Sequence, residues 1–270
     1  QEDTRAIAVT LGGPEGLEHE LRTLDLRAAE ARLASVEPGL STEDSKLYVR
    51  ALAADLARAR GALELVAREF PDWRRKSFAD PRDKKGTTRN AVGADATGLL
   101  CEVEGGRVEH VDWSAFGGNS RDLARLFNER LAREYTPEEA RGIAALLRVA
   151  AVVEAIDLAS KMLDPTRKVN FTESNAREML EAFAPATAWA QKGGDAAAAA
   201  AELSAATQLA TVLQRVTDGA YSVAVAETED LLAHHQASLL VRLLSDGSLQ
   251  LVAPGAGEGA PTGASGANAP

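Results

Sequence analysis

The chain of 270 residues has little cysteine, few aromatic residues and no long apolar run. Its single cysteine, Cys101, excludes an internal disulfide and a zinc site built from several thiolates. The longest apolar run, residues 143–153, is interrupted by Arg148 and is shorter than the ~20 residues that cross a bilayer. The sequence therefore predicts a folded protein that depends on its apolar core rather than on cross-links.

Positive charge is also scarce, because 30 basic residues face 40 acidic ones and the sequence pI is near 5.0. A phosphate backbone is bound by a positive surface, so we expect no nucleic-acid partner. The chain begins at Gln1, without a methionine. This start is compatible with a leader or a membrane tether outside this segment. The chain would then be an exported protein or the extracytoplasmic part of a membrane-anchored bacterial protein.

Alanine is abundant, with 53 residues, while aromatic residues make up only 4% of the chain. Alanine has the highest intrinsic helix propensity, and its small side chain lets helices pack closely. We therefore predict a mainly α fold, in which antiparallel helical hairpins stack as a bundle or an irregular solenoid around a small inserted β hairpin or meander. The predicted parts are an N-terminal helical hairpin (1–70), a basic loop (71–90), a small β unit (91–113), a C-terminal helical domain (114–252) and a disordered tail (253–270).

The N-terminal hairpin is predicted from two amphipathic stretches joined at Pro38 and Gly39. Residues 1–40 are expected to form one helical stretch. The second helix is expected to begin at Ser41, which makes a capping box with Asp44, and to carry an apolar stripe as far as Phe70.

The β unit is predicted from two alternating segments on either side of Gly105 and Gly106. A two-residue turn there would place Val103 opposite Val108 and Cys101 opposite His110. Residues 91–94 are expected to add a third strand. Trp113 should then anchor the unit to the helices, with its indole N–H donating to a backbone acceptor.

In the C-terminal part, Thr136 and the Pro-Glu-Glu that follows predict a helix start. The helix is apolar on nearly every side between residues 142 and 153, so we expect it to be the central buried helix. Further helices are expected to end at Pro185, to begin at Asp195 and run to residues 218–219, and to include Tyr221. A hairpin around residues 246–247 competes there with a helix through residue 244.

No residue pattern predicts catalysis, a metal site or a cofactor, so we expect no enzymatic activity. His19, His110, His234 and His235 lie at no metal-binding spacing. Cys101 beside His110 would be the one reactive pair, against the more common role of a buried cysteine as a small apolar side chain. The glycine-rich segments 11–16 and 255–259 lack the context of a nucleotide-binding loop.

Residues 74–90 carry seven basic residues against two acidic ones, opposite to the sign of the whole chain. Such a segment either docks on an acidic partner, a phosphorylated group or an anionic membrane, or is a solvated connector. The predicted partner-binding residues are Trp73, Arg74, Arg75, Lys76 and Tyr221. For Trp73 the alternative role is to end the second helix.

Two groups of residues resemble a known family. Segments 92–95, 97–99, 105–106 and 111–116 resemble a small β unit of large bacterial multidomain proteins, which combine helical repeats with an upstream module that is sometimes a serine/threonine kinase. Residues 219–224, with Gly219, Tyr221 and Ala224, resemble the second-helix signature of a tetratricopeptide-type repeat. The resemblance covers about a third of the chain and implies an irregular helical-repeat fold without an activity of its own.

We therefore expect a non-catalytic interaction, scaffolding or regulatory module that binds a protein or peptide, such as a partner helix, in a groove between helices. The alternative is an enzyme or a small-ligand binder with a polar pocket near Arg148, Glu154 and Asp157. These two acids interrupt an apolar helix, where they either pair with a base such as Arg148 or line a polar site.

Overall fold

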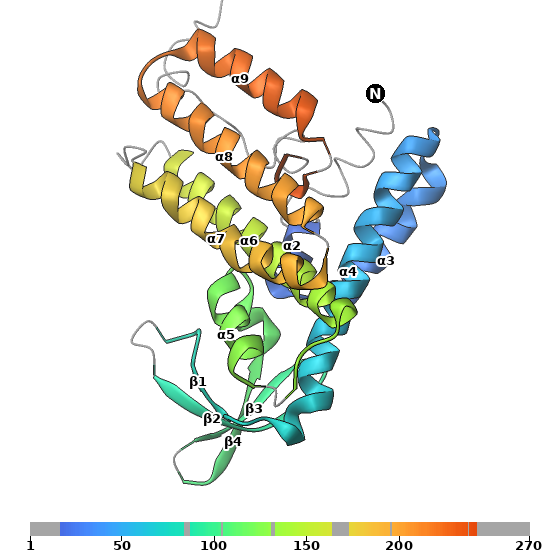
Figure 1. The fold of residues 1–270 in the computed structure, drawn as a ribbon, viewed down its shortest axis with the longest axis vertical. Helices are drawn as coiled ribbons and strands as arrows, with labels where there is room; N and C mark the ends of the chain where they lie inside the picture. The colour runs from blue at the N-terminus through green and yellow to red at the C-terminus, as the bar shows by residue number, and fades with distance from the viewer. Residues whose placement is uncertain are drawn as a thin grey trace, which may run out of the picture.

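The fold is mainly helical with one small antiparallel sheet, as the composition predicts (Figure 1). The computed structural model describes residues 17–83, 87–103, 105–130, 133–163, 173–194, 196–236 and 238–241. The predictions for the glycine-rich segments, for a cap at Asp195, for the hairpin near residue 246 and for the tail concern residues outside these described ranges.

The helices and strands are α2 (Leu17–Thr23), α3 (Leu26–Val36), α4 (Glu43–Glu69), β1 (Ser77–Ala79), β2 (Thr88–Ala94), β3 (Gly98–Val103), β4 (Arg107–Asp112), α5 (Ser120–Arg130), α6 (Pro137–Leu163), α7 (Glu173–Gly193), α8 (Ala197–Thr217) and α9 (Tyr221–His234), with 3-10 turns η1 (Glu37–Gly39), η2 (Phe70–Asp72) and η3 (Trp113–Phe116).

The first helical stretch is divided into α2 and α3, whereas the sequence predicts one stretch. Leu24 takes a φ of 53°, in the left-handed region that commonly ends helices. Asp25 then caps α3 through its side chain. α3 and α4 form the predicted hairpin, but Thr42 rather than Ser41 caps α4, because its side chain accepts the N–H of Ser45.

The sheet has the strand order β1-β2-β3-β4, and each strand pairs antiparallel with the next. It is larger than predicted, since β1 lies within the segment expected to be a basic loop. The turn after β3 has φ values of 85° and 71° at Gly105 and Gly106, as the predicted hairpin requires.

That turn is one residue longer than predicted, because Val103 pairs with Arg107. The predicted register is therefore wrong by one residue: Cys101 pairs with Glu109, and His110 pairs with Leu100. Successive strand residues point to opposite faces, so the cysteine and the histidine lie on opposite faces of the sheet.

Trp113, the predicted anchor of the sheet, begins the 3-10 turn η3 between β4 and α5. It is 3% exposed, and its ring lies 5.9 Å from that of Phe116 in the turn that leads to α5. The predicted hydrogen bond of its indole is wrong, because Nε1 is buried with no acceptor among the described residues. The buried ring of Trp113 therefore contributes apolar contact area rather than a polar contact.

α6 is the central helix, as predicted, and packs against α2, α4, α5, α7 and α8. Thr136 and Glu139 form the capping box at its start, with each side chain accepting the other residue's N–H. Between residues 142 and 156 only Arg148 and Glu154 are not buried. A helix that is apolar on all sides is stable only when neighbours cover all sides, which explains why this one became the centre.

The C-terminal helices α7, α8 and α9 each pack against the one before (Figure 1). The predicted helix end at Pro185 is wrong, because α7 continues through it to Gly193. A proline inside a helix removes one backbone hydrogen bond. The buried residues Phe183, Ala186 and Trp189 on both sides of it pack into the core, which offsets that loss.

Candidate functional site

A groove with a volume of about 380 Å³ lies between β1 and α5. Apolar side chains of Phe78, Phe116 and Leu126 contribute to its lining, and the rings of Phe78 and Phe116 are 6.1 Å apart. Arg75 and Arg125 line it as well. Because the three apolar side chains are largely buried, the open surface of the groove is mostly polar, with two guanidinium groups beside a small apolar part.

The groove lies beside the predicted basic residues. Arg75 lines it and donates from Nε to the Ser77 hydroxyl at 3.1 Å, while Arg74 and Lys76 on either side are exposed. Across the groove, Arg125 pairs with Asp122 at 3.0 Å. The charge at this end of the groove is therefore mainly positive.

Trp73 and Tyr221, the two aromatic residues predicted to contact a partner, lie in different places. Trp73 is 6% exposed and its ring packs 4.9 Å from that of Phe70, which agrees with its alternative role at the end of the second helix. Tyr221 is 46% exposed and begins α9, at the opposite end of the molecule from the sheet (Figure 1). The structure does not bring Tyr221 together with the basic residues.

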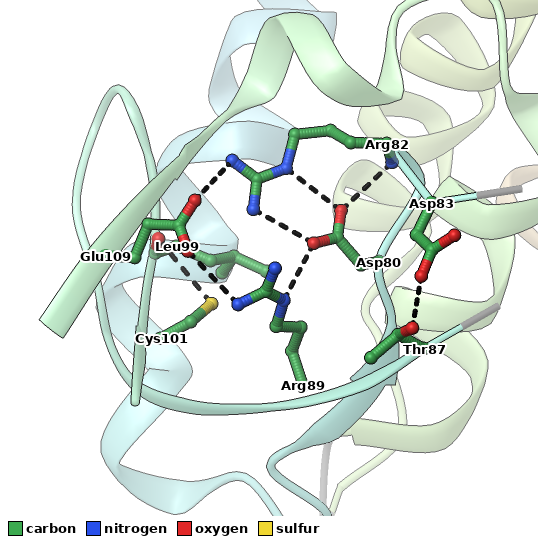
Figure 2. A network of polar contacts seen from close by, with 8 residues as sticks. All are labelled: Asp80, Arg82, Asp83, Thr87, Arg89, Leu99, Cys101 and Glu109. Carbon is green, nitrogen blue, oxygen red and sulfur yellow. Dashed lines mark hydrogen bonds and ion pairs between the residues drawn. The ribbon is translucent and has the colours of Figure 1, made fainter. Parts of the chain in front are cut away.

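Two further arginines of the basic segment are held in an ion-pair network on the sheet (Figure 2). Asp80, whose side chain is 1% exposed, pairs with Arg82 at 2.9 Å and with Arg89 at 2.8 Å. Both arginines also pair with Glu109 on β4. The hydrogen bonds from Arg82 lower the pKa of Asp80 to about 2 despite its burial. These arginines fix the turn after β1.

Cys101 is not a reactive thiol in this structure. It is fully buried, and burial raises its pKa to about 11, so the nucleophilic thiolate does not form near neutral pH. His110 lies near Thr97 and Asp112 instead, with its ring nitrogens 3.2 Å and 3.1 Å from their oxygens. The structure therefore separates the one pair that the sequence singled out for nucleophilic chemistry.

Glu154 and Asp157 line a hollow of about 350 Å³ where α5, α6 and α7 meet, together with Arg121, Glu178 and Glu181. We name this cavity the acidic hollow. Asp157 pairs with a base from another helix, Arg22 of α2. Glu154 instead accepts the N–H of Ser120 and lies 2.7 Å from the Ser120 hydroxyl, and burial raises its pKa to about 7.

Arg148 does not belong to the acidic hollow. Its side chain is 13% exposed and pairs with Asp55 of α4. The sequence placed Arg148, Glu154 and Asp157 in one pocket because they share a helix, but they lie on different sides of it. The polar pocket predicted near these three residues is therefore two separate sites.

Sequence reasoning missed Glu202, a buried carboxylate on α8. It accepts hydrogen bonds from the Ser238 hydroxyl and the Leu239 N–H, both at 2.7 Å, and from the Leu240 N–H at 3.4 Å. Burial raises its pKa. The signal that singled out Glu154, an acidic residue inside an apolar helix, applies equally to Glu202 within its alanine-rich stretch.

Comparisons with protein-family models, with curated proteins and with solved structures find no match to this chain. Within the described ranges, no helix is both long enough and apolar enough to cross a membrane. The same part of the chain holds no group of three or more histidine, cysteine or acidic side chains arranged to bind a metal ion.

Proposed function

We propose that this chain is a non-catalytic interaction module that binds a segment of a partner protein in the groove between β1 and α5. The observation that carries the proposal is a groove that two arginines line together with three apolar side chains, on a chain with a net charge of −10. The sequence predicts a groove between helices, whereas one wall of this groove is a strand. The successive packing of α6 to α9 supports the related proposal of a scaffold built like a helical repeat.

The partner that this groove fits is an acidic peptide with one large apolar side chain. The apolar side chain, which is the usual anchor of a peptide, would pack on the small exposed part of Phe78, Phe116 and Leu126. Arg75 and Arg125 would pair with carboxylates, because a guanidinium matches the planar geometry of a carboxylate. The exposed Arg74 and Lys76 would add attraction at longer range.

The alternative, an enzyme or a small-ligand binder, would use the acidic hollow. One observation favours it: Glu154 has a pKa of about 7, near the value at which a carboxyl group exchanges protons most effectively at neutral pH. The two candidates require different residues, since the groove depends on Arg75 and Arg125 and the hollow on Glu154.

Selection from a phage-displayed library of random twelve-residue peptides tests the proposal. The immobilised protein should enrich peptides in which acidic residues flank a large apolar residue. The affinity of a synthetic copy of an enriched peptide, measured by fluorescence anisotropy, should fall at least about tenfold in the double variant Arg75→Glu, Arg125→Glu, because both ion pairs become repulsive.

The matched control reverses two exposed arginines away from the groove, Arg27→Glu and Arg107→Glu, and should leave the affinity within about twofold. Equal losses in both double variants would mean that only net charge matters, which contradicts a specific groove. Failure to enrich any peptide would contradict the proposal as well.

A further inference from the structure

The hydroxyl of Ser120 lies between two acceptors from different helices. Ser120 is the first residue of α5 and is fully buried. Its Oγ is 2.7 Å from the carboxyl Oε2 of Glu154 on α6 and 2.8 Å from the backbone oxygen of Ala182 on α7. This one atom therefore joins three helices.

The number of hydrogens at this junction depends on the protonation of Glu154. A serine hydroxyl carries one hydrogen, and a backbone carbonyl only accepts. When the hydroxyl donates to Ala182, the hydrogen in the contact with Glu154 has to come from the carboxyl group. Both short contacts are therefore hydrogen bonds only when Glu154 is protonated and donates to Ser120.

An ionised Glu154 would change these bonds. A carboxylate accepts and does not donate, so the Ser120 hydroxyl would turn to donate its hydrogen bond to Glu154. The Ala182 oxygen would then face a lone pair of the Ser120 oxygen at 2.8 Å. Two buried oxygens that face each other without a hydrogen between them repel, and this cost is concentrated at the contact between α5 and α7. That contact should then loosen.

The surroundings of Glu154 favour the protonated form. Burial is the main cause that raises its pKa, and Asp122 on α5 adds to it. Asp157 on its own helix and Glu178 and Glu181 on α7 also line the hollow, but they are not among the causes of the raised pKa. Two bases oppose these acids, and both are paired: Arg121 on α5 with Glu181, and Arg22 on α2 with Asp157 and Glu18.

We propose that Glu154 and Ser120 form a proton-dependent link, which ties α5 to α7 while Glu154 is protonated and loosens when Glu154 ionises. α5 also carries Leu126 and Arg125 of the groove. Loosening the link would therefore shift one wall of the groove. That consequence rests on the proposed function, whereas the link itself does not.

A titration of the whole chain by carbon-13 NMR tests the link directly. The side-chain carboxyl signal of Glu154 is assigned by its disappearance in Glu154→Gln and is followed from pH 4 to pH 9. Its inflection should lie near pH 7. The control variant Glu178→Gln removes another carboxyl group of the hollow and should shift the inflection little. An inflection of Glu154 below pH 5 would overturn the proposal.

The stability of the junction provides a second measurement. The pKa of Glu154 is higher in the folded chain than its unfolded value of 4.5. The stabilisation that protonated Glu154 gives the fold is therefore complete below pH 4.5 and is lost as the pH rises through about 7. The urea midpoint of the wild-type chain, measured relative to that of Glu154→Gln, should therefore fall between pH 5 and pH 8. Glutamine is suited to this comparison because its amide keeps a hydrogen for Ser120 and does not titrate.

A constant difference between the two midpoints across this range would overturn the link. Neither measurement uses a peptide, so failure of the groove proposal leaves both results intact. Where a groove-binding peptide has been found, its affinity should be higher at pH 6 than at pH 8 in the wild-type chain and equal at both in Glu154→Gln. Affinity that falls equally in both proteins would contradict the coupling of the link to the groove.

Discussion

At the scale of single residues, Asp80 has the most definite electrostatic role. Its pKa of about 2 lies below the ordinary 3.8, so its ion pairs stabilise the fold above pH ~4, and this stabilisation is lost as the pH falls towards 2. Asp80→Asn should lower the free energy of unfolding by about 2 kcal/mol at pH 7, because Arg82 and Arg89 lose their shared carboxylate. Urea denaturation at pH 7 and at pH 2 measures the difference, which should nearly vanish at the lower pH.

The matched control for Asp80 is Glu102→Gln, which removes an exposed carboxylate from the same sheet. It should change the free energy of unfolding by less than about 0.5 kcal/mol at either pH. A loss at pH 7 that persists at pH 2 would mean that Asp80 acts through packing rather than through its charge.

At the scale of elements, Glu202 fixes the segment 238–241 onto α8. Glu202→Gln would place an amide NH₂ where Oε2 now accepts from the Ser238 hydroxyl and the Leu240 N–H. Leaving these buried donors without their acceptor should cost about 1–3 kcal/mol. Native-state hydrogen exchange should become faster at the amides of Leu239 and Leu240.

The exposed Glu229 on α9 provides the control for that exchange experiment. Glu229→Gln should leave the two amides as protected as they are in the wild-type chain. Equal protection in Glu202→Gln would mean that the apolar burial of Leu239, Leu240 and Val241 holds the segment without the carboxylate.

Whole elements were predictable where a local signal determines them. The capping box at Thr136 and the helical period predicted α6, because both depend on residues three or four apart. The prediction failed where tertiary packing overrides the local signal, as for the continuation of α7 through Pro185. It also failed at the turn after Val103, because one extra residue reverses the face of every later side chain.

At the scale of the whole molecule, the groove was beyond sequence reasoning although one of its residues was predicted. The basic run identified Arg75. Phe78, Phe116 and Leu126 lie in three elements, and they meet only because the fold places β1, η3 and α5 around the same groove. Charge is visible in a sequence as a local excess, whereas a concave surface depends on contacts between distant segments.

The packing of α4 against α6 joins the N-terminal hairpin to the C-terminal helices, and Gly142 permits their close approach. A Cβ at Gly142 would lie 2.9 Å from the backbone oxygen of Arg58 on α4. Gly142→Ala should therefore force the two helices apart and lower the free energy of unfolding by about 1–3 kcal/mol, although alanine is the better helix former. Thermal and urea denaturation measure this loss.

Gly61 on α4 is the matched control, because a Cβ there would meet nothing within 4 Å. Gly61→Ala should raise the free energy of unfolding by up to ~1 kcal/mol through helix propensity alone. The same chemical change in two helix interiors is thus expected to have opposite signs, and the difference between them measures the contact of α4 with α6. If both variants were stabilised equally, the two helices would not be in close contact at Gly142, and the two halves of the molecule would not share one core.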